Sequence, residues 1–173
     1  MTVTEGSLLA ALRSRHASPG NGGAGRYAFL THVRTGAAWE QQEIDAIAVA
    51  LWLSEYHDVH AFEVKCTRAD WLREIKPTMD KSTRARELCD TFTIVAPGGV
   101  VRRDELPLGW GLIEAAVRED GKITLRQSVK PARLTELPVY RQDRALPRGF
   151  VVAMLRATGA VPGMTSGLKR ARP

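Results

Sequence analysis

The spacing of apolar residues divides the first half of the chain into a helical stretch and three extended stretches. Leu8, Leu9 and Leu12 recur at the interval of a helix, so a short helix is expected from Thr4 to Arg15, with Thr4 as its N-cap. Three apolar runs rich in strand-forming residues come next. They predict strands at Tyr27 to Val33, Ile44 to Leu51 and Val59 to Lys65.

The third run places two charged side chains on one face of the sheet. Alternate residues of a strand point to the same side, so Val59, Ala61, Glu63 and Lys65 are expected to face one way. The side chains between them, His60, Phe62 and Val64, then face the other way.

A helix is expected directly after this strand. Thr67 can cap it, with Asp70 in the position of a capping-box acid. Trp71, Leu72 and Ile75 are expected to form its buried stripe. Pro77 interrupts this helix, and a second helical stretch is expected from Thr78 to about Cys89.

The remaining pattern predicts a parallel strand and a hairpin. A strand, a helical crossover and a further strand usually form a right-handed unit with a parallel pair, so the run Thr91 to Ala96 should lie parallel to the third strand. Gly111 to Val117 and Lys122 to Arg126 flank Asp120-Gly121, as in a hairpin. A last helix is expected near Phe150 to Ala157.

These elements predict an α/β fold with a mixed sheet. The chain has 173 residues, of which 44% are apolar, enough for one domain with its own core. We expect a single domain over residues 1–157 and a basic tail over residues 158–173.

The charge is unevenly distributed and favours a nucleic-acid partner. Residues 1–120 carry 14 Lys or Arg against 17 Asp or Glu, a balance of −3, whereas residues 121–173 carry 11 against 2, a balance of +9. Binding of a basic segment to phosphates releases condensed counterions. A solubilising tail would explain the same charge equally well.

The sequence indicates a cytoplasmic protein without a membrane partner. No uncharged stretch is long enough to cross a bilayer, and the first residues lack the pattern of a signal peptide. The two cysteines, Cys66 and Cys89, are separated by 22 residues, which fits neither a metal knuckle nor a disulfide framework. We expect both to be reduced.

One group of charged residues could carry chemistry. If the second and third strands pair antiparallel, Asp45 lies beside Glu63, and Lys65 is next to both. Two adjacent carboxylates repel unless a cation neutralises them, and Mg²⁺ prefers such oxygen ligands. Phosphodiester hydrolysis is the implied reaction. In the alternative interpretation, Lys65 simply neutralises the acids at an exposed sheet edge.

This pattern resembles a known motif. Asp45, 17 intervening residues and Glu63-Val64-Lys65 are similar to the motif of the PD-(D/E)XK nuclease superfamily, with Ile44 in place of the nominal proline. The region from about Glu43 to Glu114 looks like the MmcB-like DNA-repair branch. The stretches that carry this second resemblance are Phe62-Glu63-Val64-Lys65, Arg68-Ala69-Asp70-Trp71, Asp80-Lys81, Cys89-Asp90-Thr91-Phe92 and Trp110-Gly111-Leu112.

The resemblance implies a restriction-endonuclease-like core and a role for each motif residue. The core would consist of a helix, a three-strand meander, a helical crossover and a strand, with the hairpin added at the C-terminal side. Asp45, Glu63 and the Val64 carbonyl would bind Mg²⁺, with Mn²⁺ as a substitute, and Lys65 would be the catalytic lysine. A further acid is expected, with Glu5 as the first candidate and Glu40 and Glu43 as alternatives.

Three basic residues near the motif are candidate DNA contacts. Lys81 and Arg84 could share a helix face and bind phosphates, and Arg68 lies in the matched stretch. An Asp80–Arg84 surface pair is an equally good interpretation of the first two.

The function predicted from the sequence is that of a magnesium-dependent DNA endonuclease in repair or phage or bacterial DNA processing. Two alternatives remain open: a DNA-binding or repair-accessory protein that keeps the fold without turnover, and a protein-interaction subunit. A homodimer would suit an enzyme that cuts both strands of a duplex.

Overall fold

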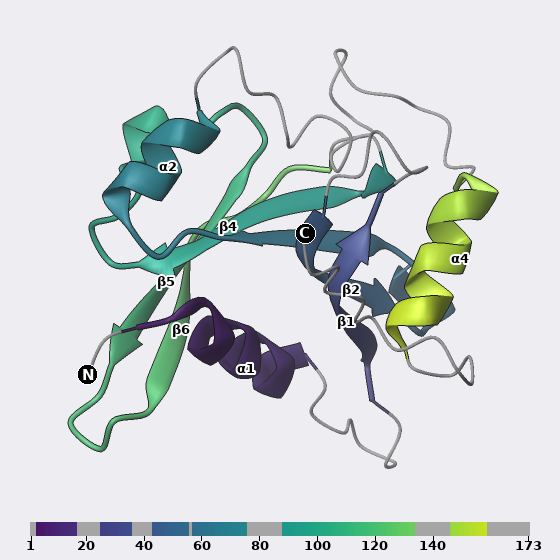
Figure 1. The fold of residues 1–173 in the computed structure, drawn as a ribbon, viewed down its shortest axis with the longest axis horizontal. Coiled ribbons are helices and arrows are strands. Elements are labelled where there is room, and N and C mark those ends of the chain that lie inside the picture. Colours follow the sequence, from purple (N-terminus) through teal and green to yellow (C-terminus); the bar gives the residue numbers. More distant parts are fainter. Residues whose placement is uncertain are drawn as a thin grey trace, which may run out of the picture.

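The protein is an α/β structure built on a six-stranded mixed sheet (Figure 1). The computed structural model describes residues 3–16, 25–35, 43–55, 57–75, 88–133 and 146–158. Among these residues no helix is both long and apolar enough to span a membrane. The described elements are α1 (Glu5–His16), β1 (Tyr27–Arg34), β2 (Glu43–Ala50), η1 (Leu53–Glu55), β3 (Val59–Val64), α2 (Arg68–Glu74), β4 (Thr91–Pro97), η2 (Arg103–Glu105), β5 (Gly111–Val117), β6 (Ile123–Val129) and α4 (Arg148–Ala157).

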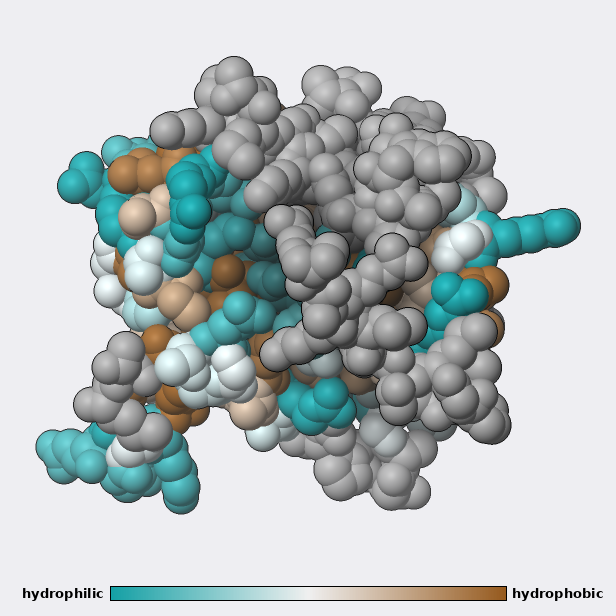
Figure 2. Space-filling view, viewed as in Figure 1, coloured by the Kyte–Doolittle hydropathy of each residue, from teal (hydrophilic) through white to brown (hydrophobic). Residues whose placement is uncertain are grey.

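The strands lie in the sheet in the order in which they occur in the chain. β1, β2 and β3 form an antiparallel meander, β3, β4 and β5 are parallel neighbours, and β6 returns antiparallel to β5. The predicted antiparallel pairing of the second and third strands, the parallel fourth strand and the hairpin are therefore confirmed. Hydrophilic residues gather at the tip of this hairpin, at the lower left of Figure 2.

Helices cover both faces of the sheet (Figure 1). The leucines of α1 pack with one set of inward-facing strand residues, and Trp71 of α2 and Phe150 of α4 pack with the other. The alternation predicted for the third strand is confirmed, because Val59 and Ala61 belong to the second core and Phe62 and Val64 to the first. The α1 core contains Leu8, Leu9, Leu12, Phe29, Ala46, Ala48, Phe62, Val64, Val95, Ile113 and Ala115.

Both predicted helix caps are present. The Ser7 N–H donates to the Thr4 hydroxyl at the start of α1, and the Asp70 N–H donates to the Thr67 hydroxyl at the start of α2. Each hydroxyl thereby takes up a backbone N–H that the first turn of a helix leaves without a partner. The Thr67 cap starts α2 three residues after β3 ends.

The predicted buried stripe of α2 is wrong at Leu72, which is 40% exposed. Successive residues of a helix are rotated by about 100°. With Trp71 pointing into the core, Leu72 is turned toward solvent, whereas Glu74 and Ile75 flank Trp71 on the inner side. The buried face of this short helix therefore contains an acid in place of a leucine.

The connection from β4 to β5 joins two parallel strands without an α-helix among its residues 98–110. Trp110 at its end is buried and meets Phe92 and Trp71 edge to face, so it is a packing residue of the core. Glu105 accepts hydrogen bonds from Trp71 Nε1 and from the guanidinium of Arg68. This connection therefore holds α2 against the sheet.

Several expectations lie outside the described residues or are settled only in part. The second helical stretch is described only at Leu88 and Cys89, and the tail is described only at Thr158. Cys66 and Cys89 are free thiols, in agreement with the prediction. The last helix is confirmed, with bounds of Arg148–Ala157.

Substituting Gly111 with alanine is expected to destabilise the fold. A Cβ at this position would lie 2.7 Å from Thr93 Oγ1 and 2.8 Å from Pro131 Cδ, so the β4–β5 register or the segment after β6 must shift. Overpacking of this kind costs about 1–3 kcal/mol. Urea unfolding should show the loss for Gly111→Ala and no comparable loss for Gly98→Ala, where the new Cβ meets open space. Equal stability of the two variants would contradict the close packing of β5.

Candidate active site

The candidate site lies where β2 and β3 separate. Their backbone pairing extends from Val49 and Val59 to Ala46 and Phe62 and stops there. Beyond that point β2 remains paired with β1, and β3 remains paired with β4. Asp45 and Glu63 are the first residues past the last pair, one on each strand, so the fork brings these two acids together.

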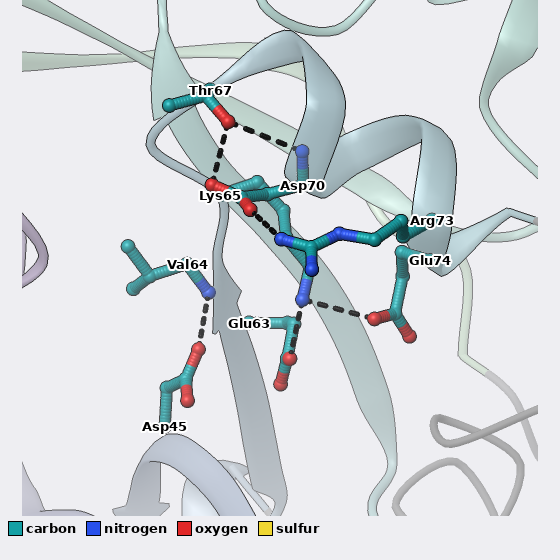
Figure 3. A network of polar contacts seen from close by, with 8 residues as sticks. All are labelled: Asp45, Glu63, Val64, Lys65, Thr67, Asp70, Arg73 and Glu74. Carbon is teal, nitrogen blue, oxygen red and sulfur yellow. Dashed lines mark hydrogen bonds and ion pairs between the residues drawn. The ribbon is translucent and has the colours of Figure 1, made fainter. Parts of the chain in front are cut away.

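The Asp45 side chain bridges the fork. Its Oδ2 accepts a hydrogen bond of 2.7 Å from the Val64 N–H, a group that β2 no longer pairs (Figure 3). A buried backbone N–H needs an acceptor, so this bond fixes the carboxylate next to the end of β3. On the neighbouring strand β1, His32 has a positive φ of 54° and lies between the pairs Thr31–Ala46 and Val33–Ile44.

Lys65 connects Glu63 to a second acid, Glu74 of α2. The Lys65 ammonium donates to Glu63 Oε1 at 2.7 Å and pairs with Glu74 Oε2 at 2.9 Å (Figure 3). All three side chains are largely withdrawn from water, with exposed fractions of 12% for Lys65, 17% for Glu63 and 6% for Glu74. Because β3 is an inner strand, the alternative interpretation is wrong about an exposed sheet edge, although the pairing of Lys65 with Glu63 that it predicts is present.

Burial and mutual repulsion make the two fork acids hard to ionise. Removal from water and, after it, the neighbouring Asp45 raise the pKa of Glu63 to about 8, against the lowering effect of Lys65. Removal from water also raises the pKa of Asp45 to about 6, against the lowering effect of the Val64 N–H and of Lys65. Burial alone would lower the pKa of Lys65, but Glu63 and Glu74 outweigh it and raise that pKa.

The site is short of positive charge. Asp45, Glu63 and Glu74 would carry three negative charges when ionised, and Lys65 supplies one positive charge. In addition, Glu74 Oε1 is buried and has no hydrogen-bond donor among the described residues. Such a group favours a further cation, because a positive ion would lower the free energy of the ionised acids.

The three acids predicted as further metal ligands lie at different places relative to Asp45. Glu5, at the start of α1, is close enough to Asp45 to raise the pKa of that carboxyl. Glu43 instead pairs with His32 at 2.9 Å and lies near Arg34, on the exposed side of β2. Glu40 lies outside the described residues. Glu5 is therefore the candidate from the sequence that the fold places near the fork.

The predicted DNA contacts are not assembled by the described residues. Lys81 and Arg84 lie outside them. Arg68 donates to the Val100 carbonyl at 3.1 Å and forms an ion pair with Glu105, which are the contacts of a residue that holds α2 in place. A role of these three residues in binding DNA stays a prediction.

Glu74 is the site residue that the sequence reasoning missed. It lies three residues after Trp71, so the two side chains share one face of α2. An acid at that distance from a buried tryptophan is the signal for it in the sequence, but Leu72, beside Trp71, favours a different buried face. The partner of Glu74 could not be found from local spacing, since it depends on how α2 packs against β3.

Two carboxylates and the Val64 carbonyl fit the oxygen ligands of a hard divalent cation. Asp45 and Glu63 approach each other closely enough to couple electrostatically. The parts of the chain that the structure describes contain no group of three or more His, Cys, Asp or Glu residues arranged around one point. The carboxylate donors that could share one ion here are therefore the Asp45–Glu63 pair.

Comparisons with known proteins show the fold alone. No family model and no curated protein matches the sequence. Among solved structures, the chain is similar to the SPO1766 protein of unknown function from Silicibacter pomeroyi, with a TM-score of 0.53 and 12% identity over 92% of this chain and 87% of that one. At this identity the likeness concerns the arrangement of helices and strands.

The raised acid pKa values predict that stability falls as the pH rises. Below about pH 4.5, Glu63 is protonated in the folded and unfolded states alike, and its contribution is fully present. Between about pH 4.5 and 8, the unfolded chain has released this proton while the folded protein still holds it, so the free energy of unfolding decreases until the pH has risen through about 8. Asp45 acts with the same sign up to about pH 6.

Urea unfolding at pH 5, 6.5 and 8 checks this dependence. Glu63→Gln should lose less stability than the wild type between pH 5 and 8, because the variant has no proton to release at this position. Glu119→Gln, at an exposed position of the β5–β6 turn, serves as the matched control and should follow the wild type. Parallel curves for all three proteins would contradict the raised pKa of Glu63.

Proposed function

We propose that this protein is a metal-dependent DNA nuclease with a restriction-endonuclease-like core, related to the PD-(D/E)XK superfamily and its MmcB-like branch. The observation that carries the proposal is the convergence of Asp45 and Glu63 at the β2–β3 fork, with Lys65 bound to Glu63. The motif spacing alone is common by chance. The proposal is supported because the motif residues lie together where two strands of a helix-covered sheet separate.

Mg²⁺, or Mn²⁺ in its place, is the cofactor that the donor set suits. Asp45, Glu63 and the Val64 carbonyl would hold the ion, with Glu5 as the candidate further acid. When bound, the ion would polarise a phosphodiester and lower the pKa of a coordinated water. It would also relieve the repulsion that raises the pKa of Glu63 and of Asp45.

Each residue of the site has a distinct part in this proposal. Asp45 is held by the Val64 N–H and therefore presents its other oxygen, Oδ1, in a fixed position. Glu63 supplies the second carboxylate from β3. The Lys65 ammonium is positively charged and lies within hydrogen-bond distance of Glu63, so it can orient a water or stabilise negative charge on a phosphate oxygen.

DNA is the proposed substrate because of the charge distribution along the chain. The +9 balance of residues 121–173 would add affinity for phosphates without sequence preference. Two copies of the chain would present two sites to the antiparallel strands of a duplex, and a homodimer is part of the proposal for this reason.

A non-catalytic DNA-binding or repair-accessory protein is the second candidate. It is favoured by the double engagement of Lys65, whose ammonium is bound by both Glu63 and Glu74. An ion cluster of this kind can also be a structural feature in a protein that keeps the fold without turnover.

Loss of the Lys65 ammonium is expected to abolish DNA cleavage. We expect Lys65→Ala to reduce the rate with Mg²⁺ by about 10²-fold or more, as for removal of one group that stabilises developing charge. Cleavage should be measured on duplex, nicked, flap and single-stranded DNA. Arg118→Ala is the matched control, because this arginine is 63% exposed at the hairpin and lies outside the basic segment of residues 121–173. Undiminished cleavage by Lys65→Ala would remove the proposed mechanism.

Binding of Mg²⁺ should depend on Asp45. Calorimetric titration is expected to detect a site in the wild type that Asp45→Asn lacks, although asparagine can still accept the Val64 N–H. Asp120→Asn is the control, since Asp120 accepts a backbone N–H in an exposed turn. Equal binding by Asp45→Asn would place the ion elsewhere. An absence of binding by both proteins, together with salt-dependent affinity for DNA, would favour the non-catalytic alternative.

A further inference from the structure

The Glu74 side chain is more buried than those of Lys65 and Glu63, and the proposed hydrolysis does not use it. This side chain is 6% exposed, and its Oε2 lies 2.9 Å from Lys65 Nζ. Burial of a carboxylate is unfavourable unless charge and hydrogen bonds compensate it. Here Oε1 has no donor among the described residues, so the compensation comes from Lys65.

Neutralisation of Lys65 does not require Glu74. Glu63 already accepts from the ammonium at 2.7 Å and can balance its single charge. A second acid on the same ammonium leaves the cluster with more acids than bases, so Glu74 adds no charge balance that Glu63 does not already supply.

The helix that carries Glu74 is firmly held. Thr67 caps α2 at its start, and Glu105 binds both Arg68 and Trp71 in its first turn. Trp71 is fully buried beside Trp110. The carboxylate of Glu74 therefore approaches Lys65 from a rigid support, whereas Glu63 approaches it from β3.

We propose that Glu74 is a positioning residue that holds the Lys65 ammonium in place while Glu63 is engaged with a cation. This inference rests on the proposed function. A cation on Glu63 would weaken the hold of that carboxylate on Lys65, because the oxygens would share their charge between two partners. The bond to Glu74 then keeps the Lys65 ammonium beside Glu63 and fixes the direction of one of its N–H groups.

The geometry separates this role from metal binding by Glu74. Its Oε2 contacts the Lys65 ammonium, whereas the proposed ligands Asp45 and Glu63 lie at the fork between β2 and β3. Lys65 has three N–H donors, of which Glu63 and Glu74 take two. The third is the donor that a phosphate oxygen or a water would receive.

The first test follows the Lys65 ammonium directly and needs no catalysis. In ¹H–¹⁵N spectra of lysine-labelled protein, the Lys65 signal is identified by its absence in Lys65→Arg. With Mg²⁺ present, proton exchange of this signal should be about tenfold or more faster in Glu74→Gln than in the wild type. Glu119→Gln, at an exposed position of the β5–β6 turn and outside α2, is the matched control, and exchange should stay as in the wild type. An unchanged Lys65 signal in Glu74→Gln would overturn the proposal.

The second test uses turnover. Glu74→Gln should lower kcat for DNA cleavage by about tenfold to a hundredfold with KM nearly unchanged, since misplacement of a reacting group acts on the chemical step. Glu74→Asp keeps the charge but is too short to reach Lys65, so it should show the same loss and also guards against misfolding of the glutamine variant. Wild-type kcat in both variants would contradict the positioning role. If the wild type itself cleaves no DNA, the proposed function fails, while the ammonium signal still decides whether Glu74 holds Lys65.

Discussion

The hydrogen bond from the Val64 N–H to Asp45 Oδ2 is the interaction on which the site depends. The sheet divides at this point, because β2 follows β1 and β3 follows β4. A fork in a sheet leaves backbone groups without their ladder partners, and one of them is satisfied here by a side chain. The same bond therefore satisfies the backbone of β3 at the fork and fixes the Asp45 carboxylate beside Glu63.

The charge balance of the cluster explains why its acids resist ionisation. Desolvation is the main cause for both fork acids, and their mutual repulsion adds to it. Lys65 offsets part of this, but it is shared between Glu63 and Glu74. A cluster with more acids than bases in a half-buried place is poorly suited to stabilise a fold and well suited to receive a cation, which is the physical basis of the proposed nuclease activity.

The elements around the fork position the side chains of the site. α1 covers one face of the sheet with its leucines and brings Glu5 near Asp45. α2 covers the other face, fastened by Glu105 and by the packing of Trp71 against Trp110. The connection between β4 and β5, which carries Glu105 and Trp110, thus supports the site from a distance in sequence, through the helix that positions Glu74.

The strands, the caps at Thr4 and Thr67, the parallel fourth strand and the hairpin could be predicted from the sequence alone. So could the nearness of Asp45, Glu63 and Lys65, given an antiparallel pairing of the second and third strands. These predictions follow from local periodicity and from short connections, which constrain neighbouring elements strongly. The separation of β2 and β3 at Asp45, the exposure of Leu72 and the contact of Glu74 with Lys65 became known only from the folded structure. These features depend on the rotation of α2 about its axis and on the point at which β2 stops pairing with β3. Packing between elements distant in the sequence determines the two, so they cannot be predicted from a local pattern of residues.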